Sequence, residues 1–206
     1  TIGQEGAVYY LESDPFTKVI VHGTYTTSTA NTWFEVQSST GQICYYGNTT
    51  GARQSYTAGN SPRIYAWYLD YVEDPLGNYM NYTYNKWSYC MYPNTIMYGN
   101  NKNGSTGLQN TVTFSYETRS NDPQLFVIEG VKGTMDRRLK TITSKTGSSV
   151  YRVYDLQYNT TGDASGTKYS RLTSVTERNG AGDVMQPVKL NWSYLPSLYS
   201  IPVSPQ

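Results

Sequence analysis

The residues best suited to chemistry in this sequence are three neighbouring carboxylates, Asp70, Glu73 and Asp74. A glycosidase would need two such groups facing each other across a cleft, and Asp74 with Asn78 offers oxygen ligands of the kind that calcium prefers. However, Asp74 also opens Asp-Pro-Leu-Gly, which carries the preferred residues of a type I turn. We therefore expect Asp74 to cap that turn and Asp70 to lie on the solvated strand face, opposite Glu73.

Aromatic side chains form the second group that could bind a ligand, because their faces stack on sugar rings. The chain has 22 Tyr, 4 Phe and 4 Trp, and the candidates for a sugar platform are Trp33, Trp67, Trp87 and Trp192. Aromatic residues in strands usually pack against cross-strand neighbours, and we expect this of Trp67 and Trp192. Trp87 falls in the predicted loop Asn85–Tyr89, so it is the candidate ligand-facing aromatic.

The sequence offers little for metal or cofactor chemistry. His22 is the only histidine and no Cys/His cluster occurs, which argues against a zinc site. We expect no cofactor. We expect His22 to be structural, because the pattern gives it no carboxylate partner. Cys44 and Cys90 could pair if their strands are neighbours, but two free, half-buried thiols are the alternative we favour. No nucleophile–base pair is recognisable, so we predict that the chain is not an enzyme.

Composition excludes two further classes. The 16 basic and 15 acidic residues leave a net charge of +1, whereas nucleic-acid or anionic-membrane binding needs a concentrated basic surface. The densest basic group, Arg137, Arg138 and Lys140, is expected to be solvated or to pair with a carboxylate across strands. No run of about 18 apolar residues occurs, so we expect no membrane span.

Short β-prone runs separated by turn residues cover most of the chain, and no window shows a helical period. We expect turns at 39–41, 74–77, 146–148 and 179–182, and a longer, mobile loop at 99–104. Residues 125–128 are a candidate for a further strand. The predicted strands are 7–11, 16–22, 32–37, 42–46, 65–74, 79–84, 95–98, 111–117, 138–144, 150–158, 171–177 and 188–194.

The strongest pattern is an internal repeat of hairpins. An alternating triplet that ends in Tyr closes the second strand of each hairpin: Met80-x-Tyr82-x-Tyr84, Val112-x-Phe114-x-Tyr116, Tyr154-x-Leu156-x-Tyr158 and Leu190-x-Trp192-x-Tyr194. In three first strands, Val or Ile follows Leu by three residues, as in Leu69 and Val72. This offset predicts either a β-bulge between the two residues or a Leu that precedes the strand.

One hairpin cannot bury its apolar face alone, but several side by side can. We therefore predict an all-β fold in which antiparallel hairpins are added side by side into an extended curved sheet or open shell, with little or no helix.

Several spaced motifs also carry a family resemblance. The run from Trp67 to Tyr84 resembles the W-x-L-x-x-V-x-D-x-x-G-N-x-I-x-Y-x-Y signature of the SpvB-type N-terminal region, which opens the B subunits of insecticidal toxin complexes and is related to YD-repeat (Rhs) shells. Phe34 to Gly47, Thr113 to Asp122 and Arg138 to Tyr158 resemble further segments in the same order. The resemblance implies a non-catalytic part of a β-shell that scaffolds or encloses other domains, and it carries over no catalytic residue.

From this resemblance we expect residues 1–195 to be an SpvB-like β-sheet region of a much larger chain, and 196–206 to be a linker or ragged tail. The implied partners are downstream domains of the same polypeptide or a toxin-complex partner subunit, and the implied location is outside a bacterial cell after synthesis in its cytoplasm. Bare sheet edges predict weak self-association. The alternative function is a secreted carbohydrate-binding β-module, and a glycosidase is a third.

Overall fold

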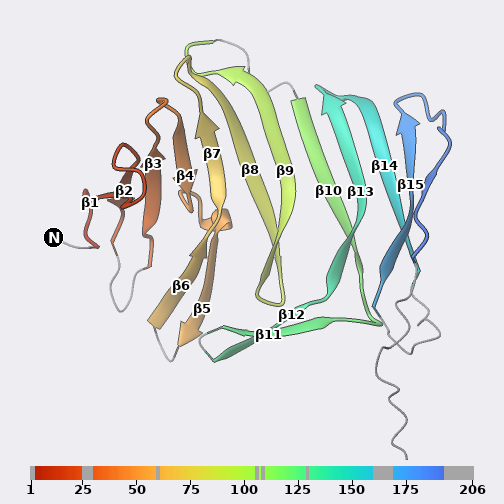
Figure 1. Cartoon of the computed structure of the whole chain (residues 1–206), viewed down its shortest axis with the longest axis horizontal. Helices are drawn as coiled ribbons and strands as arrows, with labels where there is room; N and C mark the ends of the chain where they lie inside the picture. Colours follow the sequence, from red (N-terminus) through yellow and green to blue (C-terminus); the bar gives the residue numbers. More distant parts are fainter. Residues whose placement is uncertain are drawn as a thin grey trace, which may run out of the picture.

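The computed structural model describes residues 3–24, 30–58, 61–104, 107, 110–128, 130–159 and 169–192. These residues form one twelve-stranded antiparallel sheet and two separate two-stranded hairpins (Figure 1). The order of the sheet, β1-β2-β3-β4-β7-β8-β9-β10-β13-β14-β15-β16, follows the chain apart from the two hairpins, β5–β6 and β11–β12. The prediction of an all-β fold built by adding hairpins side by side is confirmed.

The main-sheet strands are β1 (Val8–Tyr10), β2 (Lys18–His22), β3 (Trp33–Gln37), β4 (Ile43–Tyr46), β7 (Leu69–Glu73), β8 (Asn78–Trp87), β9 (Cys90–Asn101), β10 (Asn110–Thr118), β13 (Arg137–Thr146), β14 (Ser149–Asn159), β15 (Arg171–Asn179) and β16 (Val188–Lys189). The first separate hairpin pairs β5 (Arg53–Ala58) with β6 (Ser61–Trp67), and the second pairs β11 (Gln124–Ile128) with β12 (Val131–Met135). In the described part of the chain, helix is limited to the 3-10 turn η1 (Thr50–Ala52).

Three predicted elements differ from the structure. The predicted run 65–74 is divided between the end of β6 and the whole of β7, and the hairpin β5–β6 was missed because Gly59, Asn60 and Pro62 are typical of loops. Residues 99–101 belong to β9 rather than to a loop, because Asn100 and Asn101 continue the pairing with β8. Only two residues of the predicted run 188–194 form β16, and residues 193 and beyond, including the predicted tail, lie outside the described residues.

The pairing register sorts the side chains onto two chemically different faces. The apolar face, as we call it, holds a row of directly opposed residues across six strands: Val19, Val36, Cys44, Val72, Met80 and Tyr98. Because side chains alternate along a strand, the opposite face differs. The opposite face carries a row of threonines, Thr83, Thr95, Thr113 and Thr143, across β8, β9, β10 and β13. Toward β2 the same face carries packed aromatic rings, among them Trp33, Tyr45 and Tyr71.

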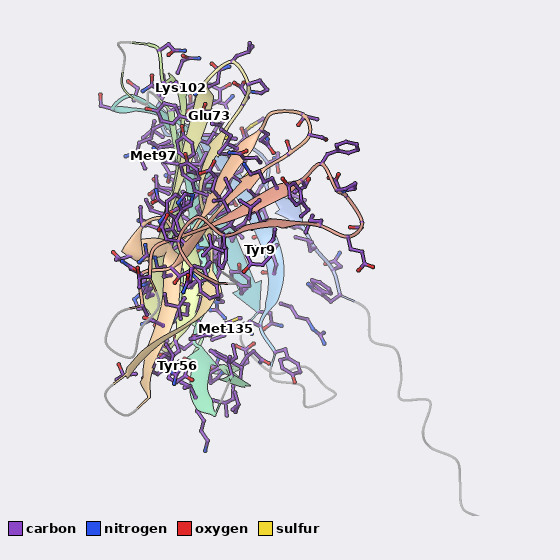
Figure 2. All side chains as sticks on the ribbon, turned by 90° about the vertical axis from the view of Figure 1, so that its left-hand side faces the viewer. Tyr9, Tyr56, Glu73, Met97, Lys102 and Met135 are labelled. Atoms are coloured by element: carbon purple, nitrogen blue, oxygen red, sulfur yellow. The ribbon has the colours of Figure 1, made fainter. Side chains whose placement is uncertain are left out.

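The main sheet is one layer thick. Figure 2 shows it close to edge on, with Glu73 and Lys102 together at one end and Tyr56 and Met135 at the other. Among the described residues, the buried hydrophobic side chains are Val21, Ala52, Cys90 and Tyr92. Most of the apolar face is therefore half-buried, shielded by neighbours in the same sheet rather than by a second layer.

β-Bulges explain the Leu-x-x-Val/Ile spacing. The register shifts by one residue where Tyr46 pairs with Leu69, where Tyr116 pairs with Leu139 and where Tyr158 pairs with Leu172. In each case one extra residue, Asp70, Lys140 or Thr173, is inserted before the Val or Ile. The bulge alternative is confirmed, and because bulges increase local twist, these repeated bulges favour a curved sheet.

Candidate functional site

A repeated side-chain hydrogen bond joins the two strands of each repeat hairpin. In every case an aromatic side chain donates to a backbone carbonyl of the first strand, at 2.6 or 2.7 Å. The donor lies on the second strand in three cases, and the fourth, Trp192, follows the short strand β16. The pairs are Tyr84 with Leu69, Tyr116 with Pro93, Tyr158 with Leu139 and Trp192 with Leu172. Pro93 therefore takes the place of the repeat Leu, with Ile96 three residues later. Trp192 makes the equivalent bond near the end of the described chain, and Tyr194, the last residue of its triplet, lies outside the described residues.

Burial keeps these phenols protonated. It raises the pKa of Tyr84 to about 12, and it also raises the pKa values of Tyr116 and Tyr158. A neutral phenol can donate to a carbonyl across the whole physiological pH range. The bond lies next to the bulge, where the regular ladder is interrupted, so it satisfies a carbonyl that the ladder leaves available.

Asp74 caps its turn as predicted. The Gly77 amide donates to Asp74 O at 2.9 Å and closes the turn. Asp74 Oδ1 accepts from the backbone amides of Leu76 and Asn78, each at 2.9 Å, and Oδ2 accepts from Asn78 Nδ2 at 2.7 Å. These hydrogen bonds, led by the one from the Asn78 side chain, lower the pKa of Asp74. Asp74 and Asn78 therefore bind each other directly.

The prediction that Asp70 lies on a solvated face is wrong. Asp70 is 4% exposed, and its Oδ2 accepts a hydrogen bond of 2.5 Å from the Thr49 amide. The bulge at Asp70 breaks the strict alternation on which the prediction rested. Glu73 is also buried; it accepts from the Tyr71 hydroxyl at 2.7 Å and forms an ion pair with Lys102 (Figure 2). The Lys102 hydrogen bond lowers the pKa of Glu73. Each carboxylate thus has its own partners.

Trp87 lies at the end of β8 rather than in a loop. Its half-buried ring packs against Tyr92 and Tyr116, with centroid distances of 5.3 and 5.7 Å. The Arg137 guanidinium carbon lies 5.4 Å from the ring centroid, within cation–π range. These contacts occupy part of its surface, and its proposed ligand-facing role remains a prediction.

The turn after Trp87 is strained and is held from both sides. Its two central residues, Ser88 and Tyr89, have positive φ values of 47° and 63°. Such backbone is normally left to Asn and Gly. The Ser88 carbonyl accepts from the Thr134 amide of β12 at 3.1 Å, and the Tyr89 carbonyl accepts from the Tyr65 hydroxyl of β6 at 2.9 Å. The β8–β9 tip therefore bridges the two separate hairpins.

His22 has the carboxylate partners that the sequence pattern did not show. Its ring stacks on Trp33 at a centroid distance of 4.1 Å. Nδ1 lies 3.2 Å from Glu5 Oε1, and Nε2 lies 3.1 Å from Glu35 Oε2. Both nitrogens can donate together only in the imidazolium form. The contacts tie the N-terminal segment to β2 and β3.

The packing roles predicted for two tryptophans have different outcomes. Trp67 packs edge-on against Phe34 at 5.1 Å and donates from Nε1 to the Thr32 carbonyl at 2.6 Å. Trp192 is 53% exposed, so its main described contact is the hydrogen bond to Leu172 and burial contributes less.

The three basic residues near the start of β13 pair with carboxylates. Arg138 Nε donates to Glu117 Oε1 at 2.6 Å, and Lys140 Nζ lies 3.8 Å from Glu117 Oε2. Arg137 Nε lies 3.7 Å from Asp136 Oδ1. These are the cross-strand and neighbouring ion pairs expected of a structural face, not an open cationic surface.

The best-satisfied buried carboxylate, Asp122, was missed as a structural centre. It is 6% exposed and accepts from Arg119 at 2.6 Å and from both the backbone amide and the hydroxyl of Ser170, at 2.6 and 2.7 Å. Arg138 also donates to the Ser170 hydroxyl at 2.6 Å. Ser170 is 48 residues away in sequence, so no local pattern could have identified this partner.

A hollow of about 500 Å³ lies where β7, β8 and β9 approach their connecting turns. Its lining includes Gln42, Asp74, Asn78, Tyr98 and Asn100. Sequence reasoning missed it because the Asn residues fell within a segment predicted to be a loop.

The described residues hold no group of three or more His, Cys, Asp or Glu that could bind a metal ion. Cys44 on β4 and Cys90 on β9 are both free, and Cys90 is buried. The described part of the chain also contains no helix long and apolar enough to cross a membrane.

Comparisons with known proteins confirm the resemblance suggested by the motifs. The profile of the family described as SpvB, Salmonella virulence plasmid 65kDa B protein, matches residues 12–143, which is more than half of the chain. A search of curated proteins gives no match.

Three solved structures are similar in fold. The N-terminal domain of effector protein SpvB from Salmonella typhimurium strain LT2 is 14% identical with a TM-score of 0.58, covering 87% of this chain and 77% of that one. The crystal structure of TcdB2-TccC3-Cdc42 is 15% identical with a TM-score of 0.63, covering 85% of this chain and 11% of that one. The Photorhabdus luminescens Tc holotoxin pore is 13% identical with a TM-score of 0.66, covering 92% and 12%. The chain thus spans about three quarters of the SpvB domain but only about a tenth of the two Tc chains, and the likeness shows the fold.

Proposed function

Because the chain belongs to the family of the Salmonella virulence plasmid 65kDa B protein, we propose that it is a non-catalytic structural segment of a larger toxin-complex-like protein. It forms part of a β-shell that scaffolds or encloses other domains. The observation that carries the proposal is the one-layer sheet, whose apolar face is half-buried and runs across at least six strands. An apolar face of this extent favours a covered position in a larger assembly.

The repeated aromatic-to-carbonyl bonds support the same role. Each bond fixes a hairpin at its bulge, and successive hairpins then pair edge to edge. This construction can be extended by adding hairpins without changing the local geometry, which is what the wall of a shell requires.

The proposal includes the domain layout and the partners. Residues 1–195 act as one β-sheet region and 196–206 as a linker. The apolar face meets downstream domains of the same polypeptide or a toxin-complex partner subunit. The extracellular destination is proposed from the family and from the toxin proteins that share the fold.

Cys44 provides a test of the covered face. It is a half-buried free thiol in the apolar row between Val36 and Val72. We expect maleimide to modify it at pH 8 in the isolated chain and at least tenfold more slowly in the full-length protein, measured by peptide mass spectrometry. The buried Cys90 is the internal control for unfolding, because it should stay unmodified in both. Equal rates at Cys44 in the two proteins would contradict a covered apolar face.

The non-catalytic part of the proposal has its own test. A screen of hydrolase and transferase substrates should show no turnover above a blank. Turnover that is lost in Asp70→Asn or Asp74→Asn would overturn it, since those are the carboxylates that a hydrolase would use.

A further inference from the structure

The hollow near the β7–β8 turn combines an apolar part with a polar part. Val72, Met80 and Tyr98 supply the apolar part and are directly opposed across β7, β8 and β9. A volume of about 500 Å³ is within the range of small-molecule sites.

The polar part is held in place by its own hydrogen bonds. Asn78 Nδ2 donates to Asp74 at 2.7 Å, and Asn101 Nδ2 donates to Asn78 Oδ1 at 3.0 Å. Asn100 Nδ2 donates to the Tyr79 hydroxyl at 2.8 Å. Asn78 keeps one N–H and one acceptor site for a ligand. Asn101 has no donor left, because its Nδ2 donates to both Leu76 O and Asn78 Oδ1. Because these groups are already ordered, a ligand would bind them without a large entropic cost.

Gln42 and Tyr98 complete the set of groups open to a ligand. The side chain of Gln42 is exposed, and its described contact is a long one, 3.8 Å from Cys44 Sγ to Oε1. Its amide can therefore turn toward a bound molecule. Tyr98 is half-buried and lines the hollow from the apolar row, and its hydroxyl can donate or accept a hydrogen bond.

The charges of the lining select the class of ligand. Asp74 is the one lining residue that is ionised at neutral pH, and its two oxygens already accept three hydrogen bonds from Leu76 and Asn78. A single carboxylate repels an anion and offers too few oxygens for a hard cation. Neutral amides and phenols beside an apolar wall instead match a molecule with many hydroxyl groups and one C–H face.

We propose that this hollow binds a neutral carbohydrate. The C–H face of the sugar rests on Met80 and the ring of Tyr98, and its hydroxyls bind the amides of Gln42 and Asn78 and the Tyr98 hydroxyl. This role goes beyond the structural role of the shell. Its residues come from β7, β8, β9 and the position before β4, which are neighbours in one sheet, so the site is complete in this chain. Because Met80 and Tyr98 belong to the apolar face, a sugar binds where that face is not covered by another domain.

The test uses the 206-residue chain with methyl glycosides of glucose, galactose, mannose and N-acetylglucosamine, and with glucuronate as the charged probe. Saturation-transfer NMR and calorimetry should show saturable binding of at least one neutral glycoside, with a Kd of about 1 mM. Gln42→Ala and Tyr98→Phe each remove one hydrogen-bonding group, and each should raise the Kd of the neutral glycoside roughly fivefold. Glucuronate should bind more weakly because of Asp74.

Gln157→Ala and Tyr151→Phe are matched controls on exposed residues outside the hollow, and they should bind as the parent does. Thermal melts confirm that each variant is folded. The proposal is overturned if no neutral glycoside binds, if Gln42→Ala and Tyr98→Phe bind as tightly as the parent, or if glucuronate binds as well as glucose.

Discussion

Asp122 holds Ser170, a residue 48 positions later, through both its backbone amide and its hydroxyl, at 2.6 and 2.7 Å. The contact joins the segment after β10 to the residue before β15, which are separated in the sheet by β13 and β14. Arg119 pairs with the same carboxylate. Burial alone would raise the pKa of Asp122, but the hydrogen bonds from Arg119 and Ser170 outweigh it and bring the pKa to about 2.

The first prediction is that Asp122 stabilises the fold and that this stabilisation is lost in acid. Its folded pKa of about 2 lies below the unfolded value of 3.8, so the stabilisation is fully present above about pH 4 and is lost as the pH falls toward 2. We expect roughly 1–2 kcal/mol from this group. The free energy of unfolding of the parent, measured in urea, should fall as the pH falls through that range. Asp122→Asn should be less stable than the parent at pH 7, and its free energy of unfolding should change less with pH below pH 4. Glu12→Gln, at an exposed carboxylate, is the control, and an equal pH slope in Asp122→Asn and the parent would contradict the assignment.

The second prediction concerns the repeat bond. Tyr158→Phe removes the hydroxyl that donates to Leu139 O at 2.7 Å and leaves the ring in place. Because the carbonyl loses a partner in a half-buried setting, unfolding free energy should fall by about 1 kcal/mol. Tyr151→Phe is the matched control, since Tyr151 is 60% exposed. Identical melting of the two variants would show that the bond does not stabilise the hairpin.

The third prediction concerns the strained turn of the β8–β9 hairpin. Tyr89 has φ of 63° and is 47% exposed, so its ring contributes little packing while its backbone is strained. Tyr89→Gly should raise stability by about 1 kcal/mol, because glycine adopts this region without the steric cost. Tyr89→Ala removes the ring but keeps the strain, so it should give no gain. A loss of stability in Tyr89→Gly would mean that the ring, not the backbone, matters at this position.

The fourth prediction compares two glycines to separate the energetic cost of a positive φ from the cost of a steric clash. Gly47 and Gly147 have φ values of 71° and 57°, so alanine should cost about 1 kcal/mol at either position. At Gly47 the new Cβ would also lie 2.5 Å from Trp67 Cδ1, whereas nothing lies within 4 Å of it at Gly147. Gly47→Ala should therefore lose a further 1–3 kcal/mol in denaturant unfolding. Equal losses of stability in Gly47→Ala and Gly147→Ala would contradict the close approach of Trp67 to Gly47.

The sequence predicts the strands well where turn chemistry and alternation agree. Asp74 and Gly77 mark their turn directly. The spacing of Leu69 and Val72 predicts either a bulge or a Leu that precedes the strand, and the register selects the bulge. Local patterns fail where a partner is distant in the chain. The burial of Asp70 depends on Thr49, and the partners of His22 come from two other segments, so neither follows from alternation.

The candidate site was less predictable than the fold for a related reason. Asn100 and Asn101 have loop-forming side chains, but pairing with β8 draws them into β9 and so creates the hollow. The triplet pattern also cannot tell which aromatic reaches the Leu carbonyl. Only the geometry assigns Trp192 to that position.

The last prediction is weak self-association through one edge of the sheet. The sequence predicted that the terminal strands at 7–11 and 188–194 are both bare. At the C-terminal end the last described strand, β16, is only two residues long, and so short an edge strand offers few backbone groups to a partner. At the other edge, no described strand pairs with the outer side of β1, where Tyr10 is 62% exposed.

Unpaired backbone groups on such an edge recruit other strands, and a charged side chain opposes this. Light scattering over a concentration series should therefore show reversible association of the 206-residue chain that Tyr10→Lys abolishes. Val188→Lys places the same charge at the opposite end, where Val188 is 65% exposed, and should leave association unchanged. Hydrogen exchange should be fast in β1 at low concentration and slower on association. A chain that is monomeric throughout, with β1 fully protected, would mean that the sheet closes on itself, and it would favour an autonomous binding module over a segment of a shell.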